Sequence, residues 1–98
     1  MDKMLQAKDF KPHIGKKFCF KGTRFVLPLV QVQADRKKLP DYVKRRPFIL
    51  IFQGPKEREL LPEGLYDCET EGGAAYSLYV IPIHTPASGC QDYQAVFS

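Results

Sequence analysis

Apolar and polar residues alternate with a period of two over much of the chain, and this alternation predicts β-strands. Phe18 and Phe20 are flanked by Lys17, Cys19 and Lys21. The segment 24–34 is rich in Val, Leu and Phe and ends in a strict alternation of Val and Gln. Successive side chains of a strand point to opposite faces, so both segments indicate strands with one buried face. Pro28 interrupts the second one and indicates a sheet edge, a bulge or two shorter strands.

The most apolar segment, 47–53, carries large apolar residues at both odd and even positions. Such a segment is typical of a strand that is covered on both sides, and the N-terminal segment is a candidate cover for one of them. We therefore expect Phe48, Leu50 and Phe52 to be buried. The dipeptide Gly54-Pro55 is expected to end this strand.

The second half of the chain repeats the β pattern at short intervals. Pro62-Glu63-Gly64 fits a turn in which proline presets φ and Gly64 adopts a positive φ. Three further strands are expected at 65–70, 75–84 and 91–97, separated by Gly72-Gly73 and by a loop at 86–89. Six strands separated by turns predict an all-β fold, a small six-stranded antiparallel sandwich or barrel.

Residues 4–15 predict a short helical turn at the N-terminus, within an N-terminal helical segment that we place at 1–16. Phe10 and Ile14 are four apart and are expected to lie on one face, as a lid over the core. Asp9 can cap this turn, Pro12 limits the helix to a turn or two, and Gly15 is a C-terminal stop signal. The whole chain, 1–98, is expected to form a single domain.

A long basic loop is predicted between two of the strands. Residues 35–46 contain six basic and two acidic residues, and a hairpin loop normally has only about 2–5 residues. These side chains suit an acidic protein surface, or nucleic-acid phosphates with the tyrosine stacked on a base; an exposed loop is also where such residues are simply solvated. The candidate partner-binding residues are Arg36, Lys37, Lys38, Tyr42, Lys44, Arg45 and Arg46.

Charge is distributed unevenly along the chain. Residues 1–58 contain all fifteen Lys and Arg and five acids, a net charge of +10, whereas residues 59–98 carry six acids and a net charge of −6. The two segments either neutralise each other within the fold or lie on opposite faces. In the second case an acidic surface, on a partner protein or on another copy of this chain, would be attracted to the basic loop.

Metal and cofactor chemistry finds no support in the residue spacing. His13 and His84 are isolated, and the cysteines form no C-x-x-C pair. We expect no cofactor, no metal site and no catalytic residue, so the chain is not expected to be an enzyme. Glu69 and Glu71 share one strand face by the two-residue period, where exposed acids are commoner than an acid–base pair.

The three cysteines are expected to be reduced thiols of a cytoplasmic protein. Cys19 and Cys68 lie in strand contexts that favour burial, and Cys90 is expected to be the exposed thiol. No secretory signal is visible, and no apolar run is long enough to span a bilayer, so no membrane association is expected.

Five segments together resemble a known family, namely 10–18 (FKPHIGKKF), 47–55 (PFILIFQGP), 61–66 (LPEGLY), 78–83 (LYVIPI) and 93–97 (YQAVF). They are similar to a small bacterial domain family of about this length that is known only as a domain of unknown function. The resemblance implies a shared fold rather than a site. It also implies an association with phage-tail-collar or fibre-like surface proteins.

The sequence thus favours a non-enzymatic protein-interaction or assembly module, with a phage-tail-like or fibre system as the setting that the resemblance implies. The alternative is a nucleic-acid-binding small β-barrel that uses residues 36–46.

Overall fold

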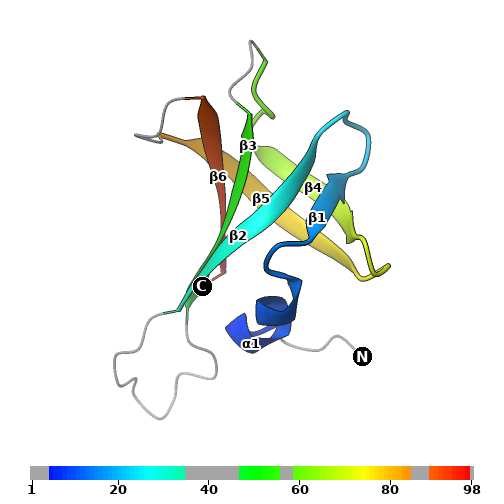
Figure 1. Ribbon diagram of the computed structural model, residues 1–98, viewed down its shortest axis with the longest axis vertical. Helices are drawn as coiled ribbons and strands as arrows, with labels where there is room; N and C mark the ends of the chain where they lie inside the picture. The colour runs from blue at the N-terminus through cyan, green and yellow to red at the C-terminus, as the bar shows by residue number, and fades with distance from the viewer. Residues whose placement is uncertain (1–4, 35–46, 56–58, 85–88, 98) are drawn as a thin grey trace.

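Six antiparallel strands close into a barrel in the computed structural model, which describes residues 5–34, 47–55, 59–84 and 89–97 (Figure 1). This confirms the predicted all-β fold with a short N-terminal helix and decides for a barrel. The elements are α1 (Ala7–Phe10), a 3-10 helix (Lys11–His13), β1 (Lys17–Phe20), β2 (Val26–Ala34), β3 (Phe48–Pro55), β4 (Gly64–Thr70), β5 (Ala75–Ile83) and β6 (Cys90–Phe97).

The strand order around the barrel is β1-β2-β3-β6-β5-β4, and β1 closes the circle by pairing with β4. Phe18 lies opposite Thr70 in this closing pair, and Phe20 lies opposite Cys68. Since each of the six strands is paired on both sides, none of them presents a free edge.

Aromatic and aliphatic side chains fill the inside of the barrel. Phe48, Leu50 and Phe52 are buried, as predicted. The Phe52 ring packs edge-on against Phe18 and Phe20, with ring centroids 5.0 and 5.5 Å apart. The buried apolar core comprises Phe10, Phe18, Phe20, Leu27, Leu29, Phe48, Leu50, Phe52, Leu61, Cys68, Leu78, Val80, Tyr93 and Ala95.

The N-terminal helix lies across one end of the barrel, beside the end of β2 and the C-terminus (Figure 1). Its Phe10 side chain is fully buried, with its ring 4.7 Å from that of Tyr76, 5.4 Å from Phe97 and 5.7 Å from Phe48. The predicted lid is therefore present. The prediction for Ile14 is wrong, because helical geometry ends at His13 and Ile14, in an extended conformation (φ −59°, ψ 129°), is 46% exposed.

A hydrogen bond fastens the same end of the barrel. His13 Nε2 lies 3.0 Å from the Tyr76 hydroxyl, whereas His13 Nδ1 is buried without a hydrogen-bond partner. Burial and, to a smaller extent, the charge of Lys16 lower the pKa of His13 below 6.5. Both effects favour the neutral form of His13 at the junction of the helical segment and β5.

One of the turn predictions needs correction. Gly64 has no positive φ; it is the first residue of β4, and the glycines with a positive φ are Gly15, Gly22, Gly73 and Gly89 among the described residues. Gly54 and Pro55 are the last two residues of β3, so the strand ends at this dipeptide but includes it. Gly54 is needed there, since a Cβ atom on it would lie 2.6 Å from Leu27 Cδ2.

The predicted irregularity in the second strand is a bulge. β2 is one continuous strand, and its register against β3 shifts between Leu29 and Gln31. Leu29 therefore faces the core, and both Val30 and Gln31 remain exposed.

The outer face of β3 differs from the prediction. The N-terminal segment closes the barrel end and does not cover this face, so Ile49 and Ile51 are only half-buried. An apolar strand therefore contributes to the outside of the barrel.

Candidate interaction surfaces

The basic loop predicted as the partner-binding element lies outside the described residues. This applies to all seven candidates, Arg36, Lys37, Lys38, Tyr42, Lys44, Arg45 and Arg46. The loop connects the end of β2 to the start of β3 in sequence. Its role stays a prediction, and the described barrel supplies the remaining surfaces.

The basic and acidic halves of the chain meet where β1 pairs with β4. Lys21 Nζ lies 3.6 Å from Glu69 Oε2, and the backbone N–H of Lys17 donates to Glu71 Oε1 at 2.7 Å. Both carboxylates line one shallow groove of about 320 Å³, together with Cys19. Glu69 and Glu71 thus lie on one side, as predicted, and the charges of this side are balanced within the fold.

The cysteines are arranged differently from the prediction. Cys68 is buried as expected, and burial, followed by the nearby Asp67 charge, raises its pKa to about 12. Cys19 is exposed, because odd-numbered residues of β1 point outward, and Cys90 is only half-buried. The most accessible thiol is therefore Cys19 rather than Cys90.

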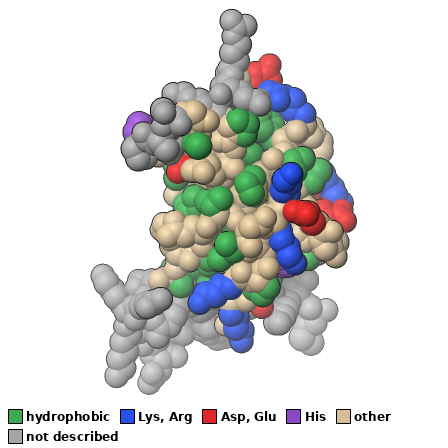
Figure 2. Space-filling view, viewed as in Figure 1, with side chains coloured by type: hydrophobic (Ala, Val, Ile, Leu, Met, Phe, Trp, Pro, Cys, Tyr) green, Lys and Arg blue, Asp and Glu red, His purple; other side chains and the backbone are tan. Residues whose placement is uncertain are grey.

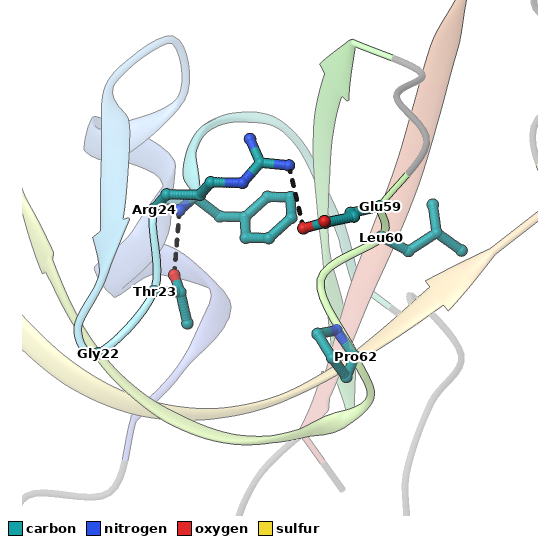
Figure 3. Close-up of a pocket in the computed structure, with 7 residues that line it drawn as sticks. Gly22, Thr23, Arg24, Glu59, Leu60 and Pro62 are labelled. Atoms are coloured by element: carbon teal, nitrogen blue, oxygen red, sulfur yellow. Dashed lines mark hydrogen bonds and ion pairs between the residues drawn. The ribbon is translucent and has the colours of Figure 1, made fainter.

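An open pocket of about 780 Å³ lies between the β1–β2 turn and residues 59–62 (Figure 3). The Arg24 guanidinium extends across to Glu59, with Nη2 3.5 Å from Oε2, and its Cζ lies 4.9 Å from the centre of the Phe25 ring. Leu60 points away from this pair. An exposed ion pair of this kind contributes little stability.

An uncharged surface lies on the outside of β2, β3, β6 and β5. Cross-strand register aligns its side chains in two rows. We call these two rows the uncharged wall: Gln33, Ile49 and Val96 form the first, and Gln31, Ile51, Gln94 and Ile81 the second.

Charged residues lie around the uncharged wall rather than in it. The next row toward one end, Gln53, Asp92 and Ile83, contains a single acid, and Gln53 Nε2 donates to Asp92 Oδ1 at 2.8 Å. Figure 2 shows apolar and uncharged side chains over much of this side, with most charged ones toward β1 and toward the end near α1. Val96 is 50% exposed although it is a large apolar residue.

A hollow of about 370 Å³ adjoins the first row of the uncharged wall. Its lining includes Ile49 and Val96 from the wall and also Ala34 and Pro47, the residues that flank the basic loop in sequence. The uncharged wall therefore has two chemically different ends, a hollow beside the flanks of a basic segment and a row with one acid.

The histidines do not come together. His13 contacts Tyr76 at the barrel end closed by α1, and His84 is exposed just after β5. No group of three or more His, Cys, Asp or Glu residues in the described ranges is arranged to hold a metal ion. Among the described helices, none has the length and apolar character needed to cross a membrane.

Sequence reasoning missed both the open pocket and the uncharged wall. The pocket joins residues more than thirty positions apart, such as Arg24 and Glu59, and no local pattern signals that pairing. A signal for the wall was present, because β5 contains no charged residue and β3 is apolar on both faces. The same apolar pattern at residues 47–53 is also typical of a strand buried on both sides.

Comparison with known proteins adds a family and nothing on activity. No curated protein and no solved structure matches this chain. A family model described as "Domain of unknown function (DUF6916)" matches residues 5–97, which include every described strand. The chain therefore belongs to the DUF6916 family of domains of unknown function.

Proposed function

We propose that this chain is a non-enzymatic protein-interaction or assembly module that binds its partner on the outside of the barrel. The observation that carries the proposal is the uncharged wall, where Val96 is 50% exposed and Ile49, Ile51 and Ile81 are half-buried in a surface without lysine or arginine. Exposed apolar side chains that gather on one face are typical of protein contact sites. A bacterial phage-tail-like or fibre assembly is the setting that we propose for such a contact.

The construction of the barrel supports an external contact. Fully buried side chains fill the barrel between Phe10 at one end and Leu61 and Tyr93 at the other, where the Leu61 N–H donates to the Tyr93 hydroxyl at 3.2 Å. The strands have no free edge to which a partner strand could be added. A protein partner would therefore contact side chains on the wall, in the open pocket or on the loops.

The basic loop gives this proposal a charge preference. Residues 36–46 carry six basic residues, and the flanks of this segment line the hollow beside the uncharged wall. A partner with an apolar centre and an acidic rim fits both features, because rim charges steer association and the apolar centre supplies affinity.

The test is a capture experiment with the full chain immobilised and host extract as the source of partners. We expect specific proteins to bind the wild type and to be lost from the triple variant Lys44→Glu, Arg45→Glu, Arg46→Glu. A control variant, Lys8→Glu, reverses one exposed charge on α1 and should retain them. Capture that is the same for all three proteins would contradict a role for the loop.

Nucleic-acid binding through residues 36–46 is the second proposal, and the observation behind it is the density of basic residues around Tyr42. A nucleic-acid binder would copurify with nucleic acid, visible in its ultraviolet absorbance, and would lose it at high salt because bound counterions are released on binding. Protein that is free of nucleic acid when purified at low salt would count against this second function.

A further inference from the structure

We infer that residues 5–13, which we call the N-terminal lid, open in acid: protonation of His13 releases them from one end of the barrel while the six strands stay folded. The inference is independent of the proposed interaction function, because it concerns how this end of the barrel opens and not what binds outside it. Three features of the closed end carry it, namely a hinge after the lid, an aromatic socket under it, and the surroundings of the His13 ring.

The hinge lies where the chain is fastened to β2. The Gly15 N–H donates to the Leu29 carbonyl at 2.7 Å, and the Leu29 N–H donates to the Lys16 carbonyl at 3.0 Å. Ile14 (φ −59°, ψ 129°) and Gly15 (φ 91°) occupy the central positions of a type II turn, which the Lys16 N–H closes on the His13 carbonyl at 2.9 Å. The lid precedes this turn and belongs to no strand, so it can move without breaking a strand pairing.

The lid closes an aromatic socket at this end of the barrel. Phe10 is fully buried between the rings of Phe48, Tyr76 and Phe97. The rings of Phe48 and Phe97 are stacked, with centroids 4.5 Å apart. An open lid would expose this socket to water, so burial of Phe10 favours the closed lid.

The charged form of His13 opposes closure. Its ring stands edge-on to Phe18 and Tyr76, with centroids 6.1 and 5.8 Å apart, and its Nε2 lies 3.0 Å from the Tyr76 hydroxyl. In the protonated ring both nitrogens carry a hydrogen, and the hydrogen on the buried Nδ1 has no acceptor within the described ranges. Water can accept it once the lid is open, so protonation favours the open lid.

The groups around the His13 ring supply no counter-charge. Burial first and Lys16 second lower the pKa of His13. On β5 the facing group is the Tyr76 phenol, whose pKa is raised by burial, then by Asp9 and Cys68. The pKa of Cys68, on β4, is itself raised to about 12, so both groups are neutral in mild acid. The Asp9 carboxylate accepts a backbone N–H at the start of α1, at 2.7 Å.

Native-state hydrogen exchange of the full chain at pH 7 and pH 5 tests this inference. Each rate is divided by the intrinsic rate at the same pH, so that protection factors are compared. The Lys11 and Ile14 amides report on the lid, because they donate to the Ala7 and Lys11 carbonyls inside this segment. The Leu29 amide reports on the barrel side of the hinge.

Two matched variants identify the titrating group. His13→Gln removes the ring that titrates, and His84→Gln makes the same change at the exposed histidine just after β5. We expect lid protection to fall at least about threefold from pH 7 to pH 5 in the wild type and in His84→Gln, and to stay constant in His13→Gln. Leu29 should remain protected at both pH values. An apolar dye such as ANS should bind more in acid only where the lid opens.

A wild-type lid that keeps its protection at pH 5 would overturn the inference, as would an equal loss in His13→Gln. Stronger protection in acid would also overturn it, because the aromatic rings would then stabilise the charged His13 ring. A joint loss at the lid and at Leu29 would show that acid unfolds the whole barrel instead. If the His13→Gln lid is already open at pH 7, the wild-type loss must follow the titration of the His13 ring resonances, and a different midpoint would overturn the inference.

Discussion

Phe52 shows how much one residue contributes to this barrel. Its side chain is fully buried, and its ring contacts two other phenylalanines of the core. Phe52→Ala leaves a cavity that its aromatic neighbours cannot refill, so we expect a loss of about 3–5 kcal/mol in the free energy of unfolding, measured by chemical denaturation. Ile51→Ala, on the half-buried outer side of the same strand, should lose less. A loss of less than about 1 kcal/mol for Phe52→Ala would contradict the packing described above.

His13 makes stability depend on pH. Its pKa is lowered in the folded protein, by burial first and by Lys16 second. The folded state therefore resists protonation, so the contribution of His13 is complete above pH 6.5 and is lost as the pH falls through the folded-state pKa. In the protonated ring both nitrogens carry a hydrogen, and neither Nδ1 nor Nε2 can then accept one, so the buried Nδ1–H has no acceptor. We expect melting temperatures to fall from pH 7 toward pH 5 in the wild type and to fall less in His13→Gln. Parallel curves for both proteins would contradict this assignment.

At the scale of elements, α1 depends on its anchor. A helix of four residues does not persist without tertiary contacts, and Phe10 makes those contacts with Tyr76, Phe97 and Phe48. We expect Phe10→Ala to remove the hydrogen-exchange protection of residues 7–14 and to leave the amides of β3 and β6 protected. Lys11→Ala, an exposed neighbour, is the control. Retained protection of residues 7–14 in Phe10→Ala would show that other contacts hold the helix.

The elements could largely be predicted from sequence, because strand periodicity follows from which side chains face the core. The errors arose where the partner of a residue lies far away in the chain. Gly64 resembles a turn glycine locally, but its pairing with Val80 makes it the first residue of a strand. Ile14 has helical spacing from Phe10, but the chain must leave the helix to reach β1, and this turns Ile14 outward.

At the scale of the whole molecule, the uneven charge was visible in the sequence but its arrangement was not. The prediction left open whether the two segments neutralise each other. The closing pair of β1 and β4 brings Lys21 to Glu69 and places Lys17 beside Glu71, and that pairing follows from barrel closure rather than from any local pattern. The uncharged wall was missed for the same reason, since its rows exist only after four strands are in register.

Barrel closure also sets where the molecule opens first. β1 is the shortest strand, with three aligned positions against β2 and three against β4, whereas β3 and β6 share eight. We expect the amides of residues 17–20 to exchange with solvent faster than those of residues 49–53, measured by native-state hydrogen exchange. The opposite order would show that the barrel opens elsewhere.

The position of β1 has a consequence for how the chain reaches its native state. The pairing of β1 with β4 aligns Phe20 with Cys68, which lies nearly fifty residues further along the chain. The strands β4 and β5, in contrast, are joined by a short turn. Distant pairings need loop closure before they gain contacts, so the β1–β4 pairing should form late, whereas β1 can pair early with β2 across the short turn that joins them. Until the barrel closes, β1 and β4 are open edges of the sheet, and refolding competes with aggregation. We therefore expect the short closing pair of β1 and β4 to decide how long these edges stay open during refolding.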